Sequence, residues 1–265
     1  MRLALNHIVS PRQPAAAFFA MARRLGVDEV EVRHGLTGAP LVDALPAAEL
    51  RRIAEGEGVH ILAVNALYPF NCLDDTIAAR AVALADYAAD AGAAGIAMYP
   101  RNDGTAVAHS RVVAALESLA PVLRDRGLRG HLEPLGLPGS SLRTKGEAIA
   151  AIEEAGGWDV FDLLHDTFHH YLADEDELYP RRTGLVHVSG VRPDGRAREA
   201  LRDSDRIHAG GADRLDSIGQ LHALLAGGYA GAVSLEPFAI EVLDLPDPEP
   251  AIRASLDALR AALSA

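Results

Sequence analysis

The sequence has very little cysteine: Cys72 is the only one among 265 residues, so no disulfide can form within the chain. This composition is typical of proteins from a reducing compartment. Long apolar runs are also missing, and none approaches the roughly 18 residues of a membrane span. The N-terminal stretch lacks the small-residue cleavage pattern of a signal peptide. We therefore expect a cytoplasmic protein without a membrane segment.

Basic residues are fewer than acidic residues. The chain has 25 Lys and Arg against 37 Asp and Glu, a formal net charge of −12. Such a field repels phosphate backbones and anionic membranes, so we expect neither nucleic acid nor a membrane as a partner. It is compatible with a neutral sugar or polyol, and it favours a cation. The sequence leaves open whether the chain forms a homo-oligomer.

Several common catalytic motifs are absent from the sequence. No GxGxxG follows a predicted strand, and there is no P-loop and no GxSxG. Cys72 lacks the neighbours of a nucleophile. The pair Gly210–Gly211 is too weak a signal for a phosphate site. These absences argue against dinucleotide, nucleotide and serine-hydrolase chemistry.

Short β-like runs alternate with longer Ala-rich helical runs along the whole chain. The predicted strands are eight in number: Leu3–Val9, Glu29–Arg33, His60–Asn65, Gly95–Tyr99, Arg129–Glu133, Phe161–Asp166, Leu185–Ser189 and Ala232–Glu236. Strands that alternate with helices indicate parallel βα units. Eight such units in about 250 residues predict a closed (β/α)8 TIM barrel, and we expect one domain over residues 1–265.

Helix-capping signals support this alternation. Asp74 precedes a helical run over residues 76–91, and Thr144 and Glu147 have the spacing of a capping box. Asp247 before Pro248 predicts the start of the last helix. Residues 193–216 form the longest segment without a clear element, and they follow a predicted strand. Loops of this kind carry the chemistry in barrel enzymes.

The last four predicted strands each end in a side chain that can bind a metal ion: Glu133, Asp166, His187 and Glu236. Active sites of TIM barrels lie at the C-terminal strand ends, and neighbouring strands bring their tips close together. Three carboxylates and one imidazole suit Mn²⁺, Mg²⁺, Co²⁺ or Zn²⁺, whereas a thiolate metal is excluded. A single acidic residue at a strand end is usually a helix cap or an ion-pair partner. Four in register on successive strands favour one divalent metal site.

Further polar residues near these strand ends are candidates for substrate binding. His169 follows Asp166 by three residues, so a helical turn would place both side chains on one face. Arg206 and His208 lie in the long loop after the seventh strand, where an arginine is more often a surface ion pair. Asn65 ends the third strand, and Arg33 ends the second on the same face as a neighbouring glutamate.

The segments HLEP, DTFHHY, HVSG, DRIHAGG and VSLEPF together resemble the sugar isomerase/epimerase superfamily of xylose isomerase-like barrels. The segments EVEVRH, AVNALYPFN and EPLGLPGSSLRTKGEAI look like its 2-keto-myo-inositol (inosose) isomerases, so the resemblance spans nearly the whole chain. D-tagatose 3-epimerases are more distant relatives. Two departures affect the substrate loop: Gly190 stands where an acidic residue is frequent, and HAGGADRLD replaces a PGxG-like turn.

The resemblance implies a role for each candidate residue. Glu133, Asp166, His187 and Glu236 would hold the metal, Glu133 and Glu236 would exchange protons with the substrate, and His169 and Arg206 would bind substrate oxygens. The implied reaction is isomerisation or epimerisation of a ketose or inosose through an enediolate.

Three other functions use related barrels. Dehydration of a polyhydroxylated ring, of the inosose or dehydroshikimate type, needs the same metal site. Cleavage of abasic DNA requires several metals, more histidines and a basic groove, against which the net charge argues. A non-catalytic sugar-binding barrel would bind its ligand without exchanging protons at carbon.

Overall fold

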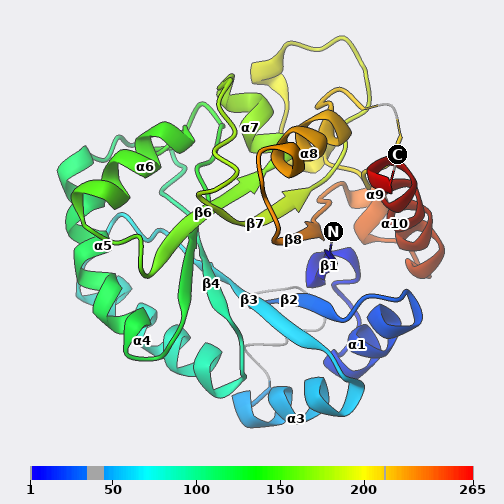
Figure 1. Ribbon diagram of the computed structural model, residues 1–265, viewed down its shortest axis with the longest axis horizontal. Coiled ribbons are helices and arrows are strands. Elements are labelled where there is room, and N and C mark those ends of the chain that lie inside the picture. The colour runs from blue at the N-terminus through cyan, green and yellow to red at the C-terminus, as the bar shows by residue number, and fades with distance from the viewer. Residues whose placement is uncertain (1, 35–44, 212, 265) are drawn as a thin grey trace.

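The computed structural model describes residues 2–34, 45–211 and 213–264. Eight parallel strands, each hydrogen-bonded to its neighbours in chain order, close into a barrel between β8 and β1. The strands are β1 Arg2–Asn6, β2 Glu29–Arg33, β3 His60–Leu67, β4 Gly95–Met98, β5 Arg129–Leu132, β6 Phe161–Asp166, β7 Thr183–Val188 and β8 Ala232–Leu235. Figure 1 shows these strands around the centre of the molecule. The predicted (β/α)8 TIM barrel is confirmed.

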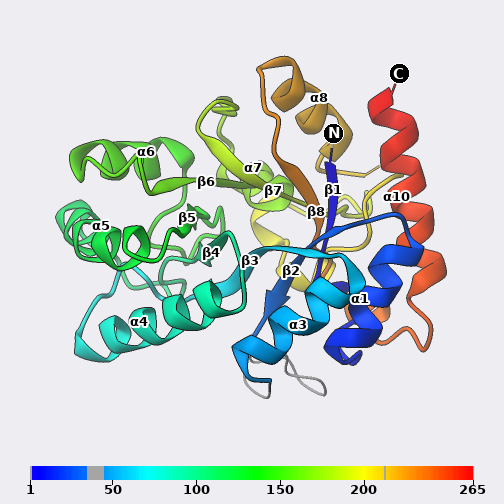
Figure 2. The ribbon, with the colours of Figure 1, turned by 60° about the horizontal axis from the view of Figure 1, so that its bottom comes forward.

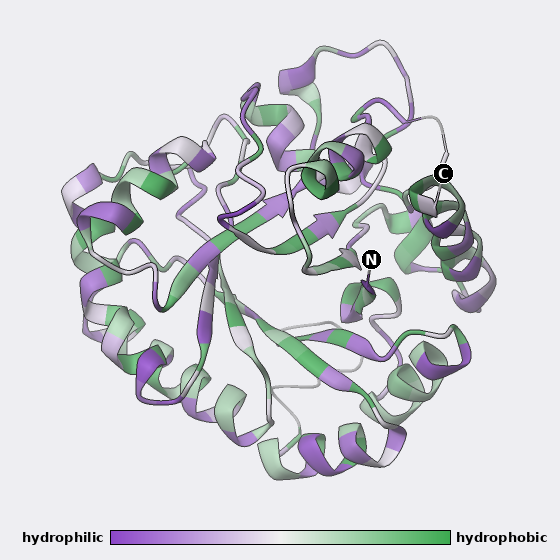
Figure 3. Cartoon of the chain, viewed as in Figure 1, coloured by the Kyte–Doolittle hydropathy of each residue, from purple (hydrophilic) through white to green (hydrophobic). Residues whose placement is uncertain are grey.

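The helices form a ring outside the strands (Figure 1). They are α1 Ala15–Arg24, α3 Ala47–Glu57, α4 Asp75–Asp90, α5 His109–Arg124, α6 Lys145–Glu154, α7 Thr167–Ala173, α8 Ser217–Ala226, α9 Ile240–Leu243 and α10 Glu249–Ser264. Hydrophilic residues gather on their outward faces, whereas the strands are mostly hydrophobic (Figure 3). Figure 2 shows α1 and α10 side by side, where Arg24 donates two hydrogen bonds to Glu249. The amphipathic helices thus cover the barrel wall.

Most local signals in the sequence act as predicted. The Asp74 carboxylate accepts a hydrogen bond from the Ile77 amide at the start of α4, and Thr144 and Glu147 complete a capping box on α6. β1 differs from its predicted range because it ends at Asn6. The Asn6 side chain accepts a hydrogen bond from the Ile8 amide at 3.1 Å and starts a 3₁₀ turn over His7–Val9. A side-chain cap thus ends the strand earlier than the apolar run suggests.

The barrel interior is filled mainly by small side chains below its C-terminal end. One buried cluster consists of Ala4, Ala63, Ala66, Ala97, Leu164, Leu185 and Ala232. Because side chains alternate along each strand, the next inward-facing residues lie one layer nearer the C-terminal ends. Toward these ends lie polar side chains, all buried: Asn6, Glu31, Asn65, Glu133, Asp166, His187, Ser234 and Glu236. The small layer therefore supports a polar layer at the barrel mouth.

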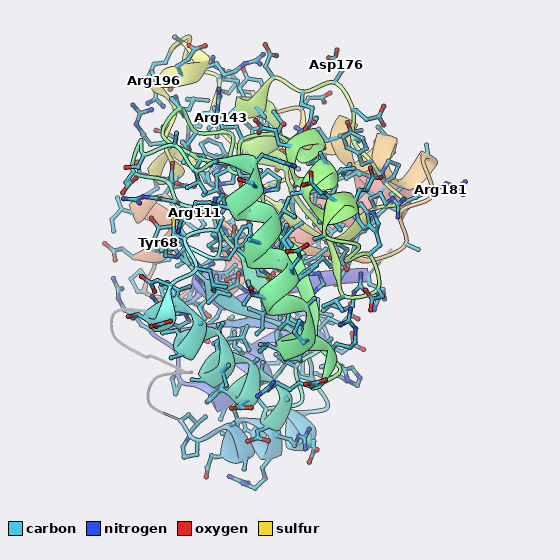
Figure 4. The ribbon with its side chains drawn as sticks, turned by 90° about the vertical axis from the view of Figure 1, so that its left-hand side faces the viewer. Tyr68, Arg111, Arg143, Asp176, Arg181 and Arg196 are labelled. Atoms are coloured by element: carbon cyan, nitrogen blue, oxygen red, sulfur yellow. The ribbon has the colours of Figure 1, made fainter. Side chains whose placement is uncertain are left out.

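Loops that follow the strands lie at this mouth. In Figure 4, Tyr68 after β3 and Arg196 after β7 lie on one side of the molecule. Arg181, which precedes β7, lies on the opposite side. In the described part of the chain, none of the helices combines the length and apolar character needed to cross a bilayer.

Candidate metal centre

The four side chains that the sequence places at strand ends converge in the structure. Glu133 and Glu236 directly follow β5 and β8, Asp166 ends β6, and His187 lies near the end of β7. All four are at most 2% exposed. Each offers one ligand atom, and these four atoms lie within 4.8 Å of one another. The barrel register therefore brings together groups that are far apart in the sequence.

The cluster has the chemistry of a cation site. His187 Nδ1 lies 3.0 Å from Glu236 Oε2, 3.5 Å from Glu133 Oε2 and 3.9 Å from Asp166 Oδ2. Among the described residues, neither His187 Nδ1 nor Glu133 Oε2 makes a well-formed hydrogen bond, although both atoms are buried. Buried polar atoms without partners are costly and rare. Three carboxylates around one imidazole nitrogen fit an oxygen-preferring or borderline divalent ion.

The two carboxylate oxygens of Asp166 have different contacts: one caps a helix, and the other faces the cluster. Its Oδ1 accepts hydrogen bonds from the amides of Phe168 at 2.7 Å and His169 at 3.1 Å, which caps α7. Its Oδ2 faces His187 and the Arg206 guanidinium. The helix cap thus holds the carboxylate in one orientation, with the second oxygen directed at the cluster.

Glu236 is held by hydrogen bonds on both oxygens. Its Oε1 accepts from Arg33 Nη1 at 2.6 Å and from Asn6 Nδ2 at 3.2 Å. Its Oε2 accepts from Arg206 Nη2 at 2.9 Å. This arrangement places the predicted substrate residues Arg33 and Arg206 against a predicted metal ligand.

The two glutamates have opposite electrostatic surroundings. Burial raises the pKa of Glu133, with Asp166 and Glu236 nearby acting in the same direction and His187 against it. Burial also acts to raise the pKa of Glu236, but His187, Arg206 and Arg33 together bring that pKa well below its ordinary value. The pair therefore combines one carboxyl that takes up a proton readily with one that stays ionised, an asymmetry suited to acid–base work.

Arg206 lies inside the site. It does not form the exposed surface ion pair that is usual for an arginine in a loop. Its side chain is 1% exposed and donates hydrogen bonds to Asp166 and Glu236. The guanidinium carbon lies 4.7 Å from the ring centre of Phe238 and 5.3 Å from that of Phe168. Two aromatic faces and two carboxylates fix the cation in place.

His169 lies at the edge of the cluster, as the spacing from Asp166 predicts. It is 4% exposed, and its Nε2 lies 3.7 Å from Glu133 Oε1 and 3.7 Å from Asp203 Oδ1. Asp203 also accepts a hydrogen bond from Arg206 Nη1 at 3.1 Å. The half-exposed Asp203 therefore joins His169 and Arg206 at the rim of the site.

The other two predicted substrate residues are placed differently. Asn65 is 1% exposed, and its amide is engaged by Tyr99 and Glu31. Neither ring nitrogen of His208 has a hydrogen-bond partner among the described residues, and burial lowers its pKa to about 4. His208 is not joined to the four ligand residues by any ion pair within the described ranges. Ala212, within the HAGGADRLD loop, lies outside the described residues.

Several site residues are missing from the sequence prediction. These are Asn6, Glu31, Tyr99, Asp203 and Phe238. The alternation of Glu31 and Arg33 on β2 is a usable signal, because an inward-facing Arg33 near the mouth implies an inward-facing Glu31 one layer below. No comparable pattern marks Asp203, which begins a short 3₁₀ turn, or Phe238, which follows β8.

Comparison with known proteins agrees with this geometry. The sequence profile described as "xylose isomerase-like TIM barrel" matches residues 19–262. The chain belongs to this family. A solved structure, that of a xylose isomerase domain containing protein from Salmonella typhimurium LT2, has 32% sequence identity to this chain and a TM-score of 0.92. The match covers 100% of this chain and 97% of that one.

Two further similar proteins have more specific names. An inosose isomerase from Halalkalibacterium halodurans is 31% identical over 153 residues, which cover 55% of this chain and 51% of that protein. The match thus spans about half the length of this curated relative. A crystal structure of an IolI protein with a bound zinc atom has a TM-score of 0.86 and 21% identity, covering 100% of this chain and 98% of that one. At this identity the second likeness supports the fold.

Proposed function

We propose that this protein is a divalent-metal-dependent isomerase or epimerase that acts on a ketose or an inosose of the 2-keto-myo-inositol type. The observation that carries the proposal is the buried group of Glu133, Asp166, His187 and Glu236, whose ligand atoms lie within 4.8 Å of one another. The similarity to an inosose isomerase over half of the chain supports the substrate class.

Mn²⁺, Zn²⁺, Mg²⁺ or Co²⁺ would be held by these four side chains. Such an ion supplies positive charge for the negative oxygen that develops when a proton leaves the carbon next to a carbonyl. Glu133 Oε2 and Glu236 Oε2 lie 3.5 and 3.0 Å from the same atom, His187 Nδ1, so both carboxylates are within reach of one bound substrate. This placement permits removal of a proton by one carboxylate and its return by the other.

The pKa asymmetry suggests how the two carboxylates divide this work. Glu133, whose pKa is raised, is the group better able to hold the transferred proton. The pKa of Glu236 is held low by His187, Arg206 and Arg33, and the two arginines face its two oxygens. Arg206 lies beside Glu236 and His169 beside Glu133, where the two side chains would donate to substrate oxygens. Return of the proton to the neighbouring carbon moves the carbonyl, and return from the opposite face inverts the centre.

Turnover in deuterated water tests the proposal. The protein is freed of metal with a chelator, reloaded with each of the four ions in turn, and assayed with a panel of inososes and ketoses. We expect an isomer of the substrate in which deuterium from the solvent replaces one hydrogen at the reacting carbon. A product lighter by one water would support the dehydratase alternative instead. Product without solvent deuterium would favour hydride transfer, and binding without any exchange would indicate a binding protein.

A further inference from the structure

We propose that Glu31, Asn65 and Tyr99 form a hydrogen-bond relay that fixes which nitrogen of His187 faces the metal. The three residues are positioning residues in this account, because they act through His187. The inference rests on the metal site of the proposed function, and it goes beyond that function by assigning a task to three residues outside the ligand set.

The relay crosses the top of the barrel from β4 to β7. The Tyr99 hydroxyl donates to Asn65 Oδ1 at 2.6 Å, and Asn65 Nδ2 donates to Glu31 Oε2 at 2.8 Å. His187 Nε2 lies 3.0 Å from both oxygens of Glu31. Glu31 and His187 are 0% exposed and Asn65 is 1% exposed, so solvent does not compete for the contacts of Glu31 with Asn65 and His187. The alanine layer beneath, with Ala63 and Ala97, leaves room for them.

The direction of each hydrogen bond follows from the one before it. The Tyr99 hydroxyl is the donor to Asn65, so the Asn65 carbonyl oxygen faces Tyr99 and its NH2 faces Glu31. Glu31 is a carboxylate that accepts from Asn65, and it therefore accepts from His187 as well. The hydrogen of a neutral His187 ring then resides on Nε2, and the lone pair resides on Nδ1. Nδ1 is the nitrogen that faces Glu133, Asp166 and Glu236.

A carboxylate behind a metal-bound histidine fixes the ring tautomer and orientation and raises ligand basicity. The relay adds a feature that a lone carboxylate lacks. The Asn65 amide orients the Glu31 carboxylate, and the Tyr99 hydroxyl in turn orients the Asn65 amide. Asn65 has both its acceptor and a donor engaged in this way. Its position therefore fits a positioning role better than the direct substrate contact expected from the sequence.

The E31Q variant tests the direction of the relay. A glutamine at this position can accept from only one of its two donors, and its NH2 group then meets the other donor. We expect Zn²⁺ affinity to fall about 10–100-fold, the range typical for loss of such a partner. N65D should also weaken Zn²⁺ binding, because it sets two carboxylates against each other.

The double variant E31Q/N65D separates a directional relay from a simple effect of charge or packing. In it, the aspartate introduced at position 65 can accept from Tyr99 and from the NH2 group of the new glutamine, while the carbonyl of that glutamine accepts from His187. Every hydrogen bond regains a donor and an acceptor, at nearly unchanged volume. We expect the Zn²⁺ Kd of the double variant to return to within about tenfold of the wild-type value, whereas independent effects would multiply.

Tyr99→Phe extends the test to the far end of the relay, and Tyr229→Phe is its matched control. Each deletes one phenolic hydroxyl that donates at 2.6 Å, to Asn65 in the first case and to the backbone oxygen of Ala232 in the second. We expect Tyr99→Phe to weaken Zn²⁺ binding about fivefold, as for loss of one hydrogen bond, and Tyr229→Phe to leave Zn²⁺ binding unchanged.

Zn²⁺ affinity is measured by competition with a chelating dye, and circular dichroism checks that each variant is folded. An E31Q affinity equal to wild type, or a double variant at the product of the two single effects, would overturn the relay. If E31Q fails to fold, N65D and Tyr99→Phe decide the matter in the same assay. Failure of the wild-type protein to bind Zn²⁺ would instead count against the proposed function.

Discussion

Glu133 and Glu236 lie 3.5 and 3.0 Å from the same nitrogen, His187 Nδ1, yet only Glu236 is hydrogen-bonded to arginine. Glu133 Oε2 has no hydrogen-bond partner among the described residues. One carboxylate is therefore held ionised by fixed cations, and the other is left with a raised pKa in a buried site. This difference has consequences for stability as well as for catalysis.

The two glutamates should respond differently to replacement by glutamine. E236Q leaves the half-buried Arg33 and the buried Arg206 without their shared carboxylate, and we expect the metal-free protein to lose about 3–5 kcal/mol of unfolding free energy. E133Q removes a carboxyl that is unfavourably buried, so its unfolding free energy should be equal to wild type or higher. Urea denaturation in the presence of a chelator measures both. Equal losses for the two variants would contradict the asymmetry.

Asp166 should show separable contributions to the helix cap and to the metal site. Asp166→Asn keeps an oxygen that can accept from the Phe168 and His169 amides, whereas Asp166→Ala removes the cap and should cost about 1 kcal/mol more in unfolding free energy. Both variants should lose metal affinity. Urea denaturation and metal titration of the same samples test this pair. Wild-type metal affinity in Asp166→Asn would exclude Asp166 as a ligand.

Replacement of Arg206 by lysine should destabilise the protein. A lysine cannot bridge Asp166 and Glu236 while it stacks on two rings, so Arg206→Lys should cost about 1.5–3 kcal/mol in stability. Turnover should fall with it. Arg196→Lys in the same loop is the control, because Arg196 makes only exposed ion pairs with Asp194 and Asp205. Similar thermal unfolding of the two variants would argue against a fixed Arg206.

His7 should make the fold less stable in mild acid. Burial lowers the pKa of His7 to about 4, with Gln13 opposing and Arg33 adding to the effect. Between pH 6.5 and 4 the unfolded chain therefore binds a proton that the folded protein does not, and stability falls as the pH falls. The contribution of His7 is about 3 kcal/mol at pH 4. Urea denaturation across this range should show a shallower pH dependence for His7→Gln.

The exposed His222 offers the matched substitution for this experiment. His222→Gln should retain the wild-type dependence of unfolding free energy on pH. A His7→Gln variant with the same pH dependence as wild type would show that His7 does not remain neutral in the folded protein.

The convergence of the four predicted ligand residues could be foreseen from the sequence, because their positions depend on pattern alone. Each follows an apolar run, and parallel strands in chain order place all such strand ends on one face of a barrel. The position of His169 could be predicted for a similar reason, because a helical turn fixes its distance from Asp166. The four-ligand cluster confirms the expected convergence of Glu133, Asp166, His187 and Glu236.

Other parts of the site depend on contacts that no local pattern encodes. Glu31 meets His187 only because the closed barrel brings side chains of β2 and β7 together in its interior, and this closure needs the full strand register. The burial of Arg206 depends on the path of a loop that brings it against Phe168 and Phe238. The early end of β1 depends on a competing side-chain hydrogen bond from Asn6. Each is a tertiary or side-chain effect that outweighs local propensity.

Metal titration of the native chain tests the central claim most directly. Protein stripped with a chelator and dialysed is titrated with Zn²⁺ and Mn²⁺, in parallel with His187→Ala and Asp166→Asn. The proposed site predicts uptake of one ion per chain by the native protein and strongly weakened uptake by both variants. Absence of uptake by the native protein, or uptake that neither variant alters, would contradict it.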